Sequence, residues 1–432
     1  MKIALAFPEL SKHNINHFLN ILENQQNRLD LLVFPEGFET IKSNNMITPE
    51  NIQDHDEVKQ ISKYYTEICK RFNISIILGI QVDYGNVSIN GQGNDQYCII
   101  FDCKGNNKFC YHKHSTSRFN AFFDNNWSIE SNFIVFGLNN KKIGVSICHD
   151  SYISLIPRVL KKKGAEIWVN ISYQNVRPKM WESVLHTRSI ENEFLSICTL
   201  HRNSNESNPQ KEPYAFSESG KIRLKDIETN AYLSEIEFDN RTGKIYYFDS
   251  DNLYVDSQKE PQIRELTNST EKLSIQLDED ENVTVKNTNN NYIIKKLNIK
   301  DFIYSPEKNW EVCLDNLNQT VLFLVLINNN KEWGTYRKKI LSTIKGRIIE
   351  FSTLFIFIDN SQKNIYLAAY RSSNYKDTRI FFPEKFPIVI DERYIKGLES
   401  TYKISLTDPR SRGNNRNIYF ERIKQIIEFL QK

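Results

Sequence analysis

Three short segments each place a reactive side chain at or just after a hydrophobic run of residues. In chain order they are LLVFPEGF with Glu36, YHKHS with Lys113 and GVSICHD with Cys148. Hydrophobic runs of this length are typical of buried strands, whose ends can hold side chains rigidly in one cleft. A carboxylate, an ammonium and a thiol held together are suited to nucleophilic attack on a carbon atom that is bonded to nitrogen.

In this chemistry the thiol of Cys148 is the nucleophile. Cys148 lies between an apolar run and a predicted helix, and backbone N–H groups at such a turn favour a thiolate and an oxyanion alike. Glu36 would accept the thiol proton and later activate water, and Lys113 would hold the negative oxygen of a tetrahedral intermediate. Taken singly, each residue also has a plainer explanation: a turn carboxylate, a solvated lysine and an inert buried thiol.

The elements that must position these side chains alternate between strands and helices. Apolar runs of strand length lie at Ile3–Phe7, Leu31–Phe34, Ile74–Ile80, Tyr97–Asp102, Lys142–Cys148, Glu166–Asn170 and Leu195–Leu200. Helical spacing of apolar residues lies at Ile15–Asn27, Val58–Phe72, Ser154–Lys163 and Lys179–Asn192. Strands interleaved with helices favour an α/β fold over an all-helical or an all-β fold.

The three reactive segments resemble those of the nitrilase superfamily, also called carbon–nitrogen hydrolases. FPEGF is similar to the family's glutamate segment, YHKHS to its lysine segment and GVSICHD to its cysteine segment. GAEIWVN, Trp181 and the RSIEN run at Arg188–Asn192 add to the agreement, which extends from about Met1 to Asp239. The resemblance implies an α-β-β-α sandwich, commonly paired with a second subunit across a helical face. It also implies a covalent thioester (from amides) or thioimidate (from nitriles) at Cys148, followed by hydrolysis or transfer.

Together the residues and the resemblance predict a thiol-dependent hydrolase of a non-peptide C–N bond. Cys148 forms the acyl-enzyme, Glu36 is the general base and Lys113 stabilises the oxyanion. Amidase-like activity on a small amide is favoured over nitrile hydrolysis. We expect no metal or organic cofactor, and a homodimer formed through the nitrilase-like domain.

The loop between the lysine and cysteine segments departs from the family pattern. Many members carry a second glutamate there, but this loop reads RFNAFFDNNWSIESNF. Asp124 is the nearest acidic residue and Glu130 comes several residues later. Asp124 is therefore a candidate for substrate binding, although a plain loop aspartate explains it equally well. Phe123, in an aromatic stretch with Phe119, Phe122 and Trp127, is a candidate for an apolar substrate pocket or for packing beneath one.

The residues beside the lysine and the cysteine have competing interpretations. His149 stands where relatives often have Tyr or Trp, so it either lines the substrate pocket or fills the aromatic's place. Asp150 either orients the active-site turn or, more simply, caps a helix before Ser151. His112 and His114 flank Lys113, and alternation along a strand would turn both away from its face, which favours structural roles.

Other chemistries explain less of the sequence. A metal site at HKH with Cys110 would lack a second cluster of ligands. A papain-like pairing of Cys148 with His186 or His201 would leave the glutamate and lysine segments unexplained. Arg188 and Glu191 are three apart in a predicted helix, so we expect an ion pair that supports the core.

A chain of 432 residues predicts two domains. We expect a nitrilase-like domain at 1–250, a polar linker or decorated boundary at 251–291 and a small α/β domain at 292–432. The last range has β-like runs at Val321–Ile327, Ser352–Ile358 and Ile365–Tyr370, and helical patterns at Lys331–Lys345 and Ile418–Leu430. It has no GxxxxGK[ST] or SGGxDS-like stretch, which argues against ATP-dependent coupling. An alternative function is a sensor or effector whose C-terminal domain binds a ligand or protein partner and gates, or has replaced, the hydrolase activity.

Charge and cysteine content exclude several classes of protein. The formal net charge of +3 argues against an extended nucleic-acid-binding surface. The seven cysteines show no CxxC pair, so neither a disulfide framework nor a zinc site is expected. No run approaches about 18 apolar residues, and Pro8 and Glu9 interrupt the first one, so we expect neither a membrane span nor a signal peptide. A reducing, cytoplasmic location fits these features.

Overall fold

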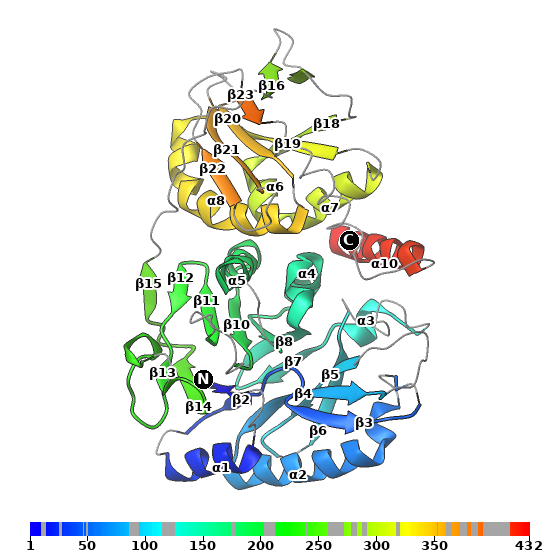
Figure 1. The fold of residues 1–432 in the computed structure, drawn as a ribbon, viewed down its shortest axis with the longest axis vertical. Helices are drawn as coiled ribbons and strands as arrows, with labels where there is room; N and C mark the ends of the chain where they lie inside the picture. The colour runs from blue at the N-terminus through cyan, green and yellow to red at the C-terminus, as the bar shows by residue number, and fades with distance from the viewer. Residues whose placement is uncertain are drawn as a thin grey trace. The chain divides into compact units, whose positions relative to one another are not determined.

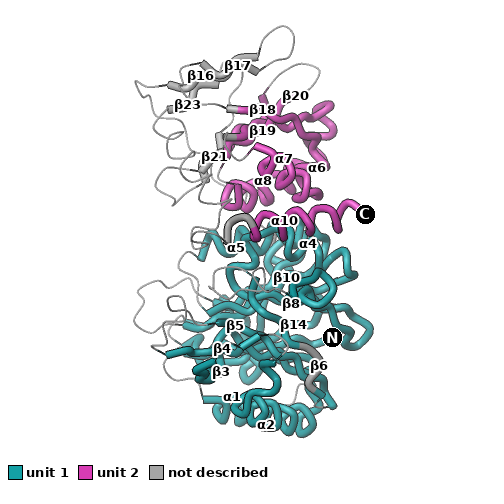
Figure 2. Tube along the Cα trace, turned by 90° about the vertical axis from the view of Figure 1, so that its right-hand side faces the viewer, with its two compact units in different colours: residues 1–258 teal, residues 259–432 magenta. Residues whose placement is uncertain are grey.

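The structure is a computed structural model. It describes residues 1–9, 14–25, 28–45, 47–48, 51–85, 95–104, 106–114, 126–173, 178–202, 212–237, 240–257, 272–277, 283–286, 292–316, 320–351, 353–359, 365–371, 378–381, 388–391 and 415–432. The chain folds into two compact units, unit 1 at Met1–Gln258 and unit 2 at Lys259–Lys432 (Figure 2). No helix within the described ranges has both the length and the apolar character needed to span a membrane.

Sheet 1 of unit 1 has eight strands. Across the sheet they are β13 (Lys225–Asp226), β14 (Lys244–Asp249), β1 (Lys2–Phe7), β2 (Leu31–Val33), β4 (Ser75–Asp83), β5 (Asp95–Phe101) and β6 (Asn107–His112), and β3 (Glu39–Lys42) pairs with β4. β1, β2 and β4 run parallel, with Ile3, Leu31 and Ser75 in register. The carboxyl ends of these three strands therefore lie at one edge of the sheet.

Sheet 2 has seven strands and lies against sheet 1 (Figure 1). Their order is β15 (Val255–Ser257), β12 (Gly220–Ile222), β11 (Tyr214–Ser217), β10 (Leu195–Thr199), β9 (Ile167–Ile171), β8 (Lys141–Ile147) and β7 (Val135–Leu138). β8, β9 and β10 are parallel, with Ile143, Ile167 and Leu195 in register. Every residue of β9 is buried, as expected of a parallel strand covered on both faces.

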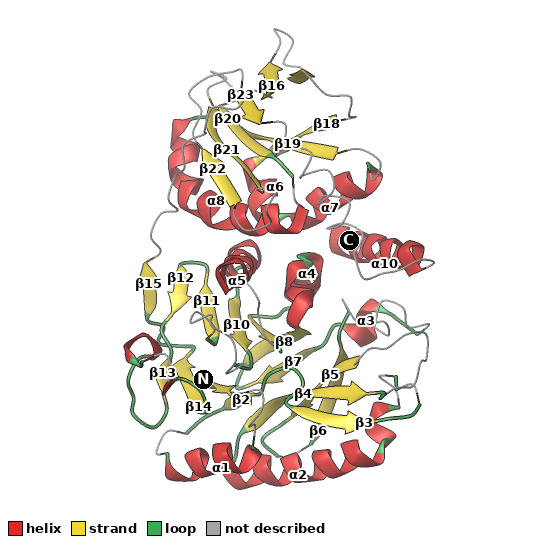
Figure 3. Ribbon diagram, in the orientation of Figure 1, coloured by secondary structure: helices red, strands yellow, loops and turns green. Residues whose placement is uncertain are grey.

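Helices cover the outer face of each sheet, which makes unit 1 an α-β-β-α sandwich (Figure 3). α1 (Ile15–Asn24) and α2 (Asp56–Phe72) lie on sheet 1, and α4 (Leu155–Lys162) and α5 (Pro178–Asn192) lie on sheet 2. Within the described residues, the connections include the short helices η1 (Ile52–Asp54), α3 (Ile129–Asn132), η3 (Cys148–Tyr152) and η4 (Leu233–Glu235). The predicted nitrilase-like sandwich is confirmed.

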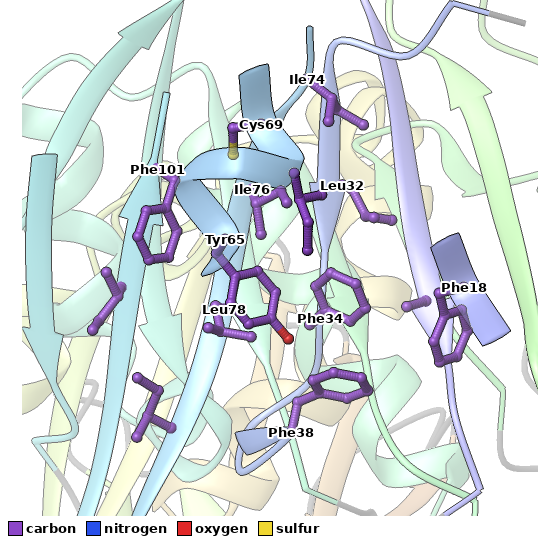
Figure 4. Packing of buried hydrophobic residues seen from close by; sticks show 14 of the residues in the cluster. Phe18, Leu32, Phe34, Phe38, Tyr65, Cys69, Ile74, Ile76, Leu78 and Phe101 are labelled. Atoms are coloured by element: carbon purple, nitrogen blue, oxygen red, sulfur yellow. The ribbon is translucent and has the colours of Figure 1, made fainter. Parts of the chain in front are cut away.

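Aromatic side chains between sheet 1 and its helices anchor the segment that carries Glu36 (Figure 4). Phe34 packs against Phe38 with ring centroids 4.4 Å apart, and against Tyr65 of α2 at 6.1 Å. All three side chains are almost completely buried. Since burying one large apolar side chain is worth roughly 1.5–3 kcal/mol, Phe34 and Phe38 hold the chain firmly on both sides of Glu36.

Unit 2 is a second, smaller α/β unit, as predicted. Its five-stranded sheet has the order β18 (Tyr292–Asn298), β19 (Thr320–Ile327), β20 (Phe355–Asp359), β21 (Ile365–Arg371) and β22 (Thr378–Phe381). A three-stranded sheet has the order β17 (Val283–Lys286), β16 (Lys272–Leu277) and β23 (Ile388–Asp391). The described helices are α6 (Ile299–Tyr304), α7 (Pro306–Asp315), α8 (Asn330–Phe351) and α10 (Asn415–Gln431).

The ends of several elements differ from the sequence prediction. The helix expected at Lys331–Lys345 continues to Phe351, and Gly346 is accommodated in its buried part. The strand expected from Ser352 begins at Phe355. The range 251–291, predicted to be a polar linker or decorated boundary, contains the strands β15, β16 and β17.

Candidate active site

The three candidate catalytic residues follow strands of both sheets. Glu36 comes after β2 and Lys113 after β6, which belong to sheet 1. Cys148 comes directly after β8, which belongs to sheet 2. The structure thus brings the thiol from one sheet to a carboxylate and an ammonium from the other.

A glycine of the neighbouring strand allows the turn that carries Glu36 to lie close to sheet 1. A Cβ atom on Gly79 of β4 would lie 2.2 Å from the carbonyl oxygen of Pro35 and 2.7 Å from Cα of Glu36. Gly37 adopts φ +66°, a left-handed conformation that favours glycine. The position of the Glu36 carboxylate therefore depends on two glycines.

Glu36 and Lys113 form a buried ion pair. Lys113 Nζ lies 2.6 Å from Glu36 Oε1, and the two residues are 7% and 2% exposed. The other carboxylate oxygen of Glu36 accepts the backbone N–H of Tyr173 at 2.7 Å. The imidazole Nε2 of His201 lies 3.0 Å from the Glu36 carbonyl oxygen, so it holds the main chain of the same residue.

Cys148 begins the short helix η3 in a conformation that non-glycine residues rarely adopt. Its φ is +49°, and its carbonyl oxygen accepts a hydrogen bond from Asn170 Nδ2 at 3.1 Å. The thiol is hydrogen-bonded to the Glu36 carboxylate and to the backbone of Tyr173. Backbone strain of this kind is often held in place at functional sites, where the surrounding contacts compensate for it.

The electrostatics of the site keep the thiol protonated and the lysine charged. Burial and the negative charge of Glu36 raise the pKa of Cys148 to about 12, although Lys113 acts in the opposite direction. Burial alone would lower the pKa of Lys113, but the Cys148 thiolate that forms at high pH and the negative charge of Glu36 outweigh it and raise that pKa. At neutral pH the resting site therefore contains a neutral thiol beside an ammonium–carboxylate pair.

Asp150 is not the helix N-cap that the sequence favoured. It lies inside η3, is fully buried, and its carboxylate accepts hydrogen bonds from the backbone N–H groups of Ile147 and His114. The phenol of Tyr111 is a third donor to the same carboxylate, at 2.8 Å. The less favoured interpretation of Asp150, that it orients the active-site turn, fits these contacts.

The two histidines beside Lys113 have buried partners. His112 Nε2 lies 2.7 Å from Asp95 Oδ1, and its ring stacks on Tyr97 at a centroid distance of 4.5 Å. His114 Nδ1 lies 2.7 Å from the Tyr111 hydroxyl. Burial, with a smaller contribution from His112, holds the pKa of His114 well below its usual value. Both contacts agree with the structural roles that strand alternation predicts.

Of the three predicted substrate-binding residues, only His149 is described. It is partly exposed and stacks on Tyr152 at a centroid distance of 4.9 Å, and Tyr152 contacts Trp181 at 5.4 Å. Asp124 and Phe123 lie outside the described residues, so their assignment stays a prediction. Glu130 is paired with Lys163 at 3.5 Å, and its side chain is 80% exposed, so it is a surface residue.

The predicted ion pair between Arg188 and Glu191 is confirmed at 2.9 Å, with both side chains fully buried. Arg188 also donates to the carbonyl oxygens of Ser151 and Tyr152 at 2.9 and 3.1 Å, so it holds the second half of η3. His186 lies 3.3 Å from the carbonyl oxygen of Glu218. Neither this contact nor that of His201 supports a papain-like pairing with the thiol.

Two residues that the sequence reasoning did not single out, Tyr173 and Asn170, support the site, and His201 supports it through a contact other than the papain-like pairing considered for it. Tyr173 acts through its backbone N–H, so its residue type carries no signal. A polar residue such as Asn170 at the end of a hydrophobic strand is a signal that a closer inspection of GAEIWVN would have found. Among the described residues, no group of three or more His, Cys, Asp and Glu side chains is arranged to hold a metal ion.

Comparison with known proteins gives a family match for part of the chain. Residues 7–218 match the family model described as carbon–nitrogen hydrolase. This part of the chain belongs to that family, within the nitrilase superfamily that its motifs indicate. No curated protein matches the chain.

Solved structures with similar folds include members of the same superfamily. A carbon–nitrogen hydrolase from Helicobacter pylori G27 is 14% identical, and the match covers 57% of this chain and 87% of that one with a TM-score of 0.40. An amidase from Nesterenkonia sp. is also 14% identical, and the match covers 57% of this chain and 89% of that one with a TM-score of 0.36. At these scores neither structure adds to what the site's own geometry indicates.

Proposed function

We propose that unit 1 hydrolyses the C–N bond of a small amide through a thioester on Cys148. The buried contact between Lys113 and Glu36, 2.6 Å long and hydrogen-bonded onward to the thiol, carries this proposal. This contact supports a mechanism in which a base, a cation and a nucleophile act together on one substrate carbonyl group. A buried ion pair in a non-catalytic core would have no need of a thiol in a strained backbone conformation.

In the first step Glu36 acts as a general base. Because the pKa of the thiol is raised to about 12, Cys148 does not ionise before the substrate binds. Glu36 accepts the thiol proton while Sγ attacks the carbonyl carbon, and Lys113 stabilises the oxyanion that forms. General base catalysis contributes about 10²–10⁴-fold, and loss of one oxyanion donor costs about 10²–10³-fold.

In the second step Glu36 acts first as a general acid and then again as a general base. Glu36 gives its proton to the leaving nitrogen, the C–N bond breaks, and ammonia or an amine departs. Glu36 then deprotonates a water molecule that attacks the thioester carbonyl. Collapse of the second intermediate releases the carboxylic acid and returns the proton to the thiol of Cys148.

Purified protein incubated with short aliphatic primary amides tests the proposal. We expect ammonia release, and an acyl adduct on Cys148 by mass spectrometry of quenched samples. Cys148→Ala should lose both signals. Cys103→Ala is the control, because Cys103 is a free and partly exposed thiol outside the site. Full turnover in Cys148→Ala would refute the mechanism.

A homodimer formed through unit 1 also stays a prediction, which sedimentation of the purified protein tests.

A further inference from the structure

A buried carboxylate connects the two chain segments that carry Lys113 and Cys148. Asp150 is fully buried, and its Oδ1 accepts the backbone N–H of His114 at 3.1 Å. Its Oδ2 accepts the backbone N–H of Ile147 at 3.2 Å. His114 directly follows the lysine and Ile147 directly precedes the cysteine, so each bond holds the main chain one residue from a reacting side chain.

A third donor, the hydroxyl of Tyr111, strengthens this connection. Tyr111 donates its hydroxyl proton to Asp150 Oδ2 at 2.8 Å, and the hydroxyl oxygen of Tyr111 lies 2.7 Å from Nδ1 of His114, from which it accepts a hydrogen bond. Since the lowered pKa of His114 keeps its ring neutral, the ring contributes an N–H donor and no positive charge. The hydroxyl of Tyr111 and the backbone N–H groups of His114 and Ile147 are thus neutral donors to the carboxylate. Hydrogen bonds to an ionised acceptor are roughly twice as strong as neutral ones.

The charged and titratable groups around Asp150 come from separate elements. Tyr111 and His114 face it from β6 and the residues after it, and the negative charge of Asp150 adds to the field around Lys113. From α5, Arg188 reaches the carbonyl groups at the far end of η3. Asp150 is thus the carboxylate in η3 that links the sheet-2 nucleophile to the sheet-1 lysine.

We propose that Asp150 is a positioning residue that sets the placement of the Cys148 thiol relative to Lys113 and Glu36. The proposal rests on the proposed function for its catalytic meaning, because Asp150 does not itself contact the reacting atoms. It differs from a purely structural role in one respect. Removing the charge should change the reactivity of the thiol in protein that remains folded.

Asp150→Asn keeps the shape of the side chain and one acceptor oxygen, but it removes the charge and turns an amide N–H₂ toward backbone donors. The loosened turn admits water to the thiol and weakens its desolvation, so the pKa of Cys148 should fall toward its usual value. The measurement is the alkylation rate of Cys148 by iodoacetamide at pH 8, followed by mass spectrometry. A fall of half a pKa unit or more multiplies the thiolate population by about three or more.

Asp226→Asn is the matched control. Asp226 is also fully buried in unit 1, and it accepts the backbone N–H groups of Glu228 and Thr229 at 2.8 and 3.0 Å, but it lies in β13 at the edge of sheet 1. We expect alkylation at least threefold faster in Asp150→Asn and unchanged in Asp226→Asn. An unchanged rate in folded Asp150→Asn, with circular dichroism like that of the control, would overturn the proposal.

If Asp150→Asn does not fold, Tyr111→Phe decides the matter, because it removes one donor and leaves the carboxylate in place. Faster alkylation in Tyr111→Phe supports the proposal, and the native rate counts against it. Alkylation needs no amide substrate, so this experiment tests the role of Asp150 even if the proposed amide hydrolysis is wrong. With an amide substrate in hand, Asp150→Asn should lower kcat by at least tenfold while KM changes much less, which a general loss of folded protein would not produce.

Discussion

The thiol of Cys148 and the carboxylate of Glu36 share the positive charge of one lysine. Burial, together with the negative charge of Glu36 beside the thiol, raises the pKa of Cys148 to about 12, so ionisation has to wait for the substrate. The arrangement protects the nucleophile from chance electrophiles at neutral pH. It also means that the alkylation rate of the thiol should depend strongly on the charge of residue 36.

Glu36→Gln should therefore make the Cys148 thiol more reactive toward alkylation while it slows amide hydrolysis. Without the negative charge of residue 36, the positive charge of Lys113 lowers the pKa of the Cys148 thiol. Alkylation by iodoacetamide at pH 7.5 should therefore be faster than in the native protein. Amide hydrolysis should fall by about 10²–10⁴-fold, because the proposed general base is gone. Rates of alkylation and of ammonia release on the same preparation check this. Slower alkylation in the variant would contradict the assigned electrostatics.

At this scale the sequence was informative where chemistry depends on the side-chain type. A carboxylate, an ammonium and a thiol at strand ends could be found from residue identity alone. The N–H of Tyr173 and the imidazole that holds the Glu36 carbonyl act on the main chain. Contacts made by main-chain groups do not require a particular residue type, so the sequence gives no sign of them. The role of Asp150 could not be predicted either, because it depends on donors that are 36 and 39 residues away in the chain.

Among the elements, β4 determines where the turn after β2 lies. Gly79→Ala would place a methyl group 2.2 Å from the Pro35 carbonyl oxygen, so either the turn or the strand must move. We expect a loss of about 1–3 kcal/mol in the free energy of unfolding, with reduced hydrolysis because Glu36 shifts. Gly137→Ala in β7 is the control, since its new methyl group would meet nothing within 4 Å. Equal urea midpoints for the two variants would rule out this packing argument.

The helix α5 supports η3 through Arg188. Arg188→Met should destabilise unit 1 by about 3–5 kcal/mol, because the Glu191 carboxylate would remain buried without its partner. Arg71→Met on α2 removes an arginine whose ion pair with Glu23 is exposed, and it should cost about 1 kcal/mol or less. Urea denaturation of the two variants measures the difference. A similar cost for both would mean that burial of the Arg188 pair is unimportant.

The elements themselves were predictable in proportion to their length and their apolar content. The central strands β1, β4, β8, β9 and β10 are continuous buried runs, and the amphipathic helix α2 shows clear periodicity. The strands β11 to β15 were not predicted, because they are two to six residues long and several contain few apolar residues. Their pairing depends on partners distant in the sequence, as in β1 with β14.

At the scale of the molecule, the residues that form the proposed site all belong to unit 1. A chain ending at Gln258 should therefore alkylate Cys148 at the same rate as the full chain. The alternative function, in which residues 292–432 gate the hydrolase, predicts a changed rate after this truncation. Circular dichroism confirms that the shorter chain is folded before the rates are compared. Failure to label either chain, even at high pH, would point instead to a site that has lost its reactivity.

The division of the site between two sheets has a mechanical consequence. The base and the ammonium are attached to sheet 1 and the nucleophile to sheet 2, and packed sheets lie roughly 10 Å apart with only side chains between them. The side chains packed between the two sheets thus determine how far the Cys148 thiol lies from Glu36 and Lys113. Hydrostatic pressure, which compresses such a space slightly, should alter turnover before it alters the secondary structure.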